Sequence, residues 1–116
     1  MNRVFFQLAL IAAAMLPVHA NAAYECNVSV RNVLVYSGGL VNIYHNARGD
    51  YTMLCNLSAD YNGVSANTCT IWTAMLLAIK KKNGTASFYY NGTGSCATML
   101  TYTDAPVPVY IADVTP

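Results

Sequence analysis

Apolar and polar residues alternate along most of the chain, and a period of two residues predicts strands. The alternation starts at Cys26, shifts phase at Asn32 and continues to Val35, which predicts one strand with a bulge or bend. Ser37 and two glycines follow, and glycine allows the positive backbone angles that a tight hairpin turn needs. We therefore expect residues 40–45 to return as the second strand.

The same period predicts further extended segments later in the chain. A turn at residues 46–50 is followed by a third strand, in which alternate residues from Tyr51 to Leu57 share one face. Pro106 and Pro108 cannot donate a backbone hydrogen bond, so the final segment belongs at a sheet edge. The later extended segments are predicted at residues 85–91, 96–103 and 107–112.

The stretch after residue 66 has the 3.6-residue period of a helix instead. Asn67, Thr68 or Thr70 can cap its start, and Asn83 with Gly84 ends it. Three lysines, residues 80–82, occupy the last turn, where cations complement the negative helix end. A binding patch for phosphate or membrane is the alternative interpretation of these lysines. The predicted buried face consists of Ile71, Trp72, Met75, Leu76 and Ile79.

This order of elements predicts the fold class. Three strands, one helix and two or more further strands are the order of an OB-fold. We expect a mainly β protein with one helix, in which a five-stranded, partly open barrel carries the helix between strands 3 and 4. A plain β-sandwich is the alternative, although it offers no obvious place for a capped helix.

The N-terminal residues have the pattern of a cleavable secretory signal. Arg3 supplies a positive charge, an apolar run from Val4 to Leu16 follows, and Ala20-Asn21-Ala22 is a small-any-small cleavage site. Residues 1–22 are thus predicted to be a signal peptide, and residues 23–116 a single domain of 94 residues. A retained membrane anchor is the alternative. We expect a secreted or periplasmic protein without a membrane span after processing.

Charge and cysteine content narrow the functional classes. Five basic side chains balance five acidic ones after processing, which argues against nucleic acid or an anionic membrane as partner. Four cysteines in an exported chain favour two disulfides, for which three connectivities are possible. Zinc is disfavoured because the chain has no Cys-x-x-Cys pair and His45 is the lone mature histidine. We expect no metal and no cofactor.

Motifs of the common enzyme classes are not found in the sequence. Ser37, His45 and Asp50 offer the side chains of a catalytic triad, but turns and strand ends commonly contain these residue types. We therefore expect a protein that is not an enzyme.

Nine tyrosines are the compositional feature that points to binding. Each combines a flat apolar face with a hydroxyl, which suits stacking on a sugar ring and bonding to its rim. Protein contact and simple covering of the sheets are the alternatives.

Two groups of residues occur in a distinctive order. Tyr36-Ser37-Gly38 precedes a short strand ending at Tyr44-His45, and Cys55 follows ten positions later. The second group runs from Cys69 and Trp72 through the helix and Gly84 to Phe88-Tyr89-Tyr90. Over residues 36–91 this order resembles the B subunit of subtilase cytotoxin and its relatives.

The resemblance implies a function and a site. Members of that family are OB-fold lectins that form rings of five, bind sialylated glycans on host cells and carry a separate catalytic subunit. By position, Ser37 would meet the sugar's carboxylate and Tyr90 would line the same pocket, with Tyr36, Gly38 and Tyr89 beside them. We expect an exported glycan-binding protein that forms a pentamer, recognises sialylated or related host glycans and has a possible catalytic A-type partner.

The resemblance also implies the disulfide pairing. It pairs Cys55 with Cys69 and leaves Cys26 to pair with Cys96. The alternative function is a small structural or interaction protein, or an inhibitor of a secreted enzyme, with no sugar site.

Overall fold

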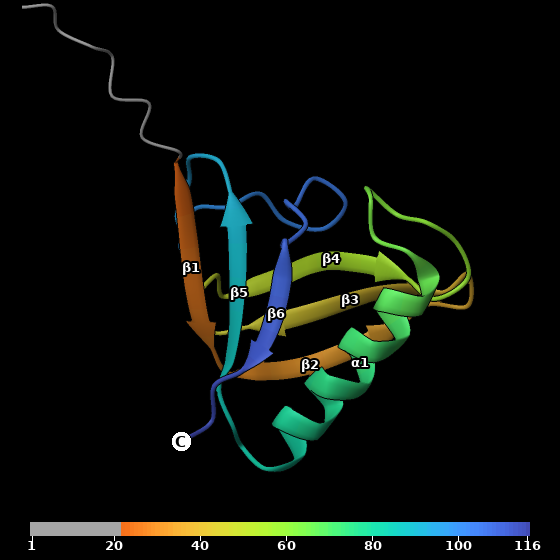
Figure 1. Cartoon of the computed structure of the whole chain (residues 1–116), viewed down its shortest axis with the longest axis horizontal. Coiled ribbons are helices and arrows are strands. Elements are labelled where there is room, and N and C mark those ends of the chain that lie inside the picture. Colours follow the sequence, from red (N-terminus) through yellow and green to blue (C-terminus); the bar gives the residue numbers. More distant parts are fainter. Residues whose placement is uncertain (1–21) are drawn as a thin grey trace, which may run out of the picture.

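The structure, a computed structural model, describes residues 22–116 and is mainly β with one helix (Figure 1). The predicted signal peptide, except for Ala22, lies outside the described residues. The strands form two three-stranded antiparallel sheets, in the orders β1-β5-β6 and β2-β3-β4. The elements are β1 (Ala23–Val28), β2 (Val30–Val35), β3 (Leu40–His45), β4 (Asp50–Asn56), α1 (Ala66–Lys81), β5 (Ala86–Asn91) and β6 (Tyr110–Asp113).

The predicted first strand divides at Ser29, and its two halves enter different sheets. β1 pairs with β5, whereas β2 pairs with β3. Asn46 holds the corner, since its side-chain oxygen accepts from the Ser29 amide at 2.8 Å and its own amide donates to the Ser29 carbonyl at 3.2 Å. The prediction of five strands in one barrel is therefore wrong in this respect. The described residues form six strands in two sheets, and the helix follows the fourth strand.

The first hairpin forms as the sequence predicts. The register of β2 against β3 shifts between Val30 and Asn32, where the sequence pattern changes phase. Gly39 has φ of +95° and donates to the Tyr36 carbonyl at 2.9 Å. A Cβ at Gly39 would lie 2.5 Å from the Ser58 hydroxyl oxygen, so this turn needs glycine for both its angle and its space.

The C-terminal third agrees with the sequence only in part. The strand predicted at residues 85–91 is β5, and the last strand, β6, lies at a sheet edge as predicted. The strand predicted at residues 96–103 is wrong. Amides of Thr98 and Met99 donate to the Ser95 carbonyl, which makes a turn, and Tyr102 forms only an isolated bridge to Thr52.

The helix begins at Ala66, and its cap lies two to five residues before the positions that the sequence suggests. Ser65 is the cap, because its hydroxyl accepts from the Thr68 amide at 3.1 Å; the predicted caps Asn67, Thr68 and Thr70 do not take this role. At the other end Asn83 has φ of +53°, and the Gly84 amide donates to the Ile79 carbonyl at 2.8 Å.

The buried face of the helix is rotated relative to the prediction. Trp72, Leu76 and Ile79 are buried as expected, but Ile71 is 63% exposed. Its place is taken by Cys69 and Thr73. The disulfide from Cys69 to Cys55 of β4 pulls this side of the helix against the sheet.

The core lies where the two sheets and the helix meet. His45 of β3 and Phe88 of β5 stack across the sheets with ring centroids 5.7 Å apart. Both disulfides pair as the resemblance implied. Cys55–Cys69 joins β4 to α1, and Cys26–Cys96 joins β1 to the loop after β5. The largest fully buried apolar side chains are Val28, Val41, Ile43, Leu54, Leu76, Ile79 and Phe88.

Candidate functional site

Three of the residues expected to bind glycan lie together at the turn between β2 and β3. Ser37 and Gly38 are exposed, and Tyr36 is 43% exposed. The Tyr36 hydroxyl accepts from the buried side-chain amide of Asn42 at 3.3 Å. This turn presents a hydroxyl and an aromatic ring to solvent.

The other two expected residues lie on β5, in the other sheet. Tyr90 is only 2% exposed, and its ring stacks on Tyr24 with centroids 5.0 Å apart. Burial, and then the neighbouring Tyr24, raise the pKa of the Tyr90 hydroxyl. Tyr89 stacks on Tyr110 of β6, also at 5.0 Å. Figure 1 separates the end of β5 from the β2–β3 turn, so the fold does not bring Tyr90 and Ser37 together.

A surface hollow is lined by Tyr24, the residue that stacks on Tyr90. We call it the Tyr24 hollow; its volume is about 320 Å³. It combines one aromatic ring, several hydroxyls, one side-chain amide and one carboxylate. The residues that line it are Tyr24, Asn91, Thr93, Gly94, Ser95, Thr98, Met99, Leu100, Asp104 and Pro106.

Short-range contacts fix the walls of the Tyr24 hollow. A Cβ at Gly94 would lie 2.9 Å from the Tyr24 ring, so glycine lets the loop pack directly on that ring. The hydroxyls of Ser95 and Thr98 are 2.6 Å apart, and the Cys26–Cys96 disulfide fastens this loop to β1. Tyr24 therefore stacks on Tyr90 and meets the loop only at its Cε1, Cζ and hydroxyl atoms, and the rest of the ring lines the hollow.

The Tyr24 hollow offers side chains that suit the binding of a polar ligand. Its hydroxyl, amide and carboxylate groups can bond to a polar ligand, while the tyrosine face takes an apolar patch. Burial raises the pKa of Tyr24, so this hydroxyl is neutral at ordinary pH. Within residues 22–116, no group of three or more His, Cys, Asp or Glu side chains is placed to hold a metal ion.

Sequence reasoning missed Tyr24 as a site residue, although a signal was present. Tyr24, Cys26 and Val28 alternate along β1, so they share the inner face on which Tyr90 also lies. The loop after Asn91, which contains Gly92 and Gly94, forms the other wall of the hollow. Its contact with Tyr24 depends on the pairing of β1 with β5, which the sequence pattern does not specify.

The side chains that resemble a catalytic triad are not assembled as one. His45 lies opposite Asp50 in the β3–β4 register, but Ser37 is beyond the other end of β3. Burial, and then the charge of Arg48, lower the pKa of His45 to about 4. The Nδ1 atom of His45 already accepts from the Arg48 amide at 3.3 Å. This histidine therefore has a place in the core and no contact with a nucleophile.

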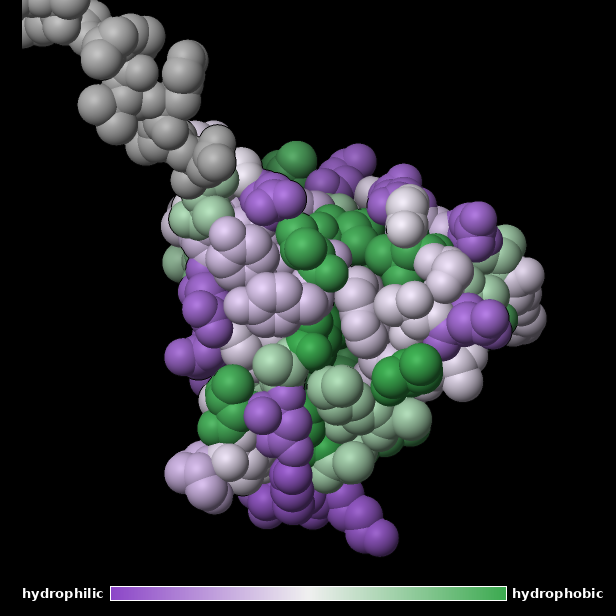
Figure 2. Space-filling model, viewed as in Figure 1, coloured by the Kyte–Doolittle hydropathy of each residue, from purple (hydrophilic) through white to green (hydrophobic). Residues whose placement is uncertain are grey.

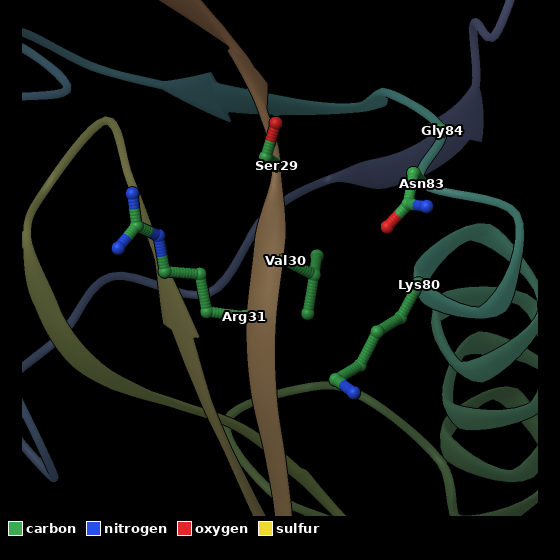
Figure 3. A pocket seen from close by; sticks show the side chains of 6 residues that line it. All are labelled: Ser29, Val30, Arg31, Lys80, Asn83 and Gly84. Carbon is green, nitrogen blue, oxygen red and sulfur yellow. The ribbon is translucent and has the colours of Figure 1, made fainter.

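A second hollow, of about 290 Å³, lies where the corner at Ser29 meets the end of the helix. Lys80 and Asn83 reach into it from the helix side, whereas Arg31 points away across β2 (Figure 3). Because the two cations do not converge, this hollow lacks the clustered charge that an anion site needs.

The lysines at the end of α1 form an exposed polar end of the molecule. Figure 2 shows hydrophilic residues gathered below the helix, and Lys80, Lys81 and Lys82 are all exposed. Lys82 forms an ion pair with Asp113, and this hydrogen bond lowers the pKa of Asp113 to about 2. One of the three cations is thus already engaged within the chain.

Comparisons with protein-family models, curated proteins and solved structures find no significant match to this chain. In the described part, no helix has the length and hydrophobicity required to cross a membrane.

Proposed function

We propose that this protein is an exported glycan-binding module and that its sugar site is the Tyr24 hollow. The observation that carries the proposal is one aromatic ring facing a set of neutral hydrogen-bonding side chains in a hollow of about 320 Å³. Sugars combine apolar C–H faces with a rim of hydroxyls, and small-ligand sites pair apolar surface with a few convergent polar groups.

Several contacts hold the binding groups in place, including the disulfide that joins their loop to β1. Tyr24 offers its ring while Tyr90 and Gly94 limit the ring's movement. Asn91, Thr93 and Ser95 line the same hollow with groups that donate and accept hydrogen bonds. A site that is ordered before binding loses less conformational entropy when the ligand arrives.

The resemblance to toxin B subunits supports the same class of function. It gives Tyr90 a role in the sugar pocket, and Tyr90 is the residue on which Tyr24 stacks. On this resemblance we propose that the two sheets are a variant of the OB-fold, and we propose a ring of five copies, host glycans as ligands and a possible catalytic partner subunit. The two disulfides support a secreted or periplasmic location, because such bonds persist in oxidising compartments.

A second candidate is a protein-interaction module without a sugar site, and the outer strand β2 favours it. β2 lies at the edge of its sheet, with Leu34 40% exposed and Val35 53% exposed. An edge strand with exposed apolar side chains is a surface for pairing with another chain. This candidate predicts capture of a specific protein partner and no response to sugars.

Titration of the processed protein with glycans selected on an array tests the proposal. Tyr24→Ala should weaken binding at least about tenfold, because it removes the stacking face, whereas Tyr24→Phe should retain most of the affinity. Tyr110→Ala is the matched control, since Tyr110 is 45% exposed and packs on Tyr89 away from the hollow.

Three results would contradict the proposal. Folded protein that binds no glycan would refute sugar binding altogether. Wild-type affinity in Tyr24→Ala would refute the site. Loss of binding in Ser37→Ala together with wild-type affinity in Tyr24→Ala would move the site to the β2–β3 turn that the resemblance indicates.

A further inference from the structure

We infer that the Tyr24 hollow selects non-acidic sugars and rejects sialylated ones, and that Asp104 sets this specificity. The inference rests on the proposed function and names the ligand class of the same site. It departs from the sialylated ligand that the resemblance implies.

The charge of the lining disfavours an acidic ligand. Among the described residues that line the Tyr24 hollow, Asp104 alone carries a formal charge. Asn91, Thr93, Ser95 and Thr98 contribute neutral groups. A sugar carboxylate is normally recognised by a cation or by several charge-assisted donors, and this lining contains no lysine or arginine.

Among the described residues, no ion pair compensates the charge of Asp104. Within residues 22–116 the ion pair of the chain joins Lys82 to Asp113, and none involves Asp104. Arg48 donates from Nε to the Met99 carbonyl at 2.6 Å and does not line the hollow. A carboxylate on the ligand would therefore meet the like charge of Asp104 in a hollow whose lining contains no cation.

Asp104 belongs to a turn that backbone hydrogen bonds hold in place. Its amide donates to the Thr101 carbonyl at 3.2 Å, and the next amide, of Ala105, donates to Tyr102 at 3.2 Å. Tyr102 is in turn held to β4, since its amide donates to Tyr51 and its carbonyl accepts from Met53. The backbone of Asp104 thus cannot swing away from the hollow without breaking these contacts.

Asp104 is exposed, so water screens its charge, and a like charge a few ångströms away should change affinity by up to about tenfold. Neutral hexoses avoid this repulsion, and a protonated amino sugar would gain an attraction. Building a repulsive group against the wrong ligand is an ordinary way to obtain specificity.

The test uses glycans in matched pairs that are identical except for a terminal sialic acid, with affinities measured for the pair that binds best. Wild-type protein should prefer the asialo member by about tenfold. Asp104→Asn should reduce this preference below about threefold, and added salt should weaken the preference of the wild type. Asp60→Asn, which removes the same charge from an exposed loop residue, should leave the wild-type preference intact.

Each remaining outcome overturns the inference, and the outcomes separate it from the proposed function. Equal or tighter binding of the sialylated member, lost in Tyr24→Ala, refutes the specificity while the sugar site stands. Equal effects of Asp104→Asn and Asp60→Asn refute the role of Asp104, because net charge would then explain the preference. Absence of binding to either member by folded protein refutes the proposed function and the inference together.

Discussion

The two sheets of this protein are assembled in different ways and present different surfaces. Sheet β2-β3-β4 is built from strands that follow one another in the chain. Sheet β1-β5-β6 combines the first strand with the last two. The first sheet is tied to the helix by cysteines 14 positions apart, and the second is closed by cysteines 70 positions apart.

This difference determines where a pocket can form. Successive hairpins display Tyr36, Ser37 and Gly38 in linear order on one exposed turn. The other sheet brings Tyr24 against Tyr90, and the single connection between β5 and β6 supplies the rest of the hollow's lining. The sheet made from distant segments therefore carries the hollow, and the sheet made from neighbours carries the exposed turn.

Removing one disulfide at a time should show the largest difference between the two sheets, in the free energy of unfolding and in sugar binding. Chain-entropy estimates give about 4 kcal/mol for the loop closed by Cys26–Cys96 and about 3 kcal/mol for Cys55–Cys69, from separations of 70 and 14 residues. Double alanine variants compared by urea unfolding should show these losses. The Cys26/Cys96 variant should also lose sugar binding.

The matched comparison is the Cys55/Cys69 variant under conditions where it remains folded. We expect it to keep the affinity of the wild type, because neither cysteine lines the Tyr24 hollow. Unchanged binding in the Cys26/Cys96 variant would show that the bridge does not support the site.

Acid should loosen the joint between the sheets, where His45 stacks on Phe88. In the folded protein the pKa of His45 is about 4, below its ordinary 6.5, so the unfolded chain takes up the proton first as pH falls. The stabilisation is complete above pH 6.5 and is lost as pH falls toward 4. We expect a loss of about 2 kcal/mol between pH 7 and pH 5, measured by urea unfolding.

His45→Gln provides the control for this pH dependence, because glutamine does not titrate in the range. Its unfolding free energy should change much less between pH 7 and pH 5. An equally steep loss in His45→Gln would assign the pH dependence to other groups.

Two adjacent glycines give the smallest and most local test, confined to the β2–β3 turn. Gly39→Ala should cost about 1 to 3 kcal/mol, because φ is +95° and the new Cβ would lie 2.5 Å from the Ser58 hydroxyl oxygen. Gly38→Ala should change stability by less than about 0.5 kcal/mol, since nothing lies within 4 Å of its Cβ position. Unfolding midpoints of the two variants check this contrast, and equal midpoints would contradict it.

The elements that depend on local sequence were predictable, and those that depend on distant pairing were not. The turn at Gly39, the bulge near Asn32 and the helix around Trp72 follow from spacing and residue type. The division of the first strand at Ser29 does not, because alternation continues across the corner while the pairing partner changes.

The candidate site shows the same limit. The family resemblance directed attention to Tyr90, but burial beneath Tyr24 depends on β1 pairing with β5. Helical spacing alone predicts that Ile71 is buried. In the structure the disulfide-bonded Cys69 lies on the buried face of the helix, and Ile71 is exposed. Contacts between residues far apart in the chain decided both cases.

The corner at Ser29 also orders events in time. During synthesis Cys26 is the first of the four cysteines to emerge and Cys96 is the last. β1 therefore cannot pair until β5 has been made, whereas the hairpins of the other sheet can form earlier. Until Cys96 emerges, Cys26 either stays free or forms a bond that later exchanges, because joining cysteines in order of appearance would give Cys26–Cys55. The native pairing thus requires that oxidation be reversible or delayed until the whole chain is present.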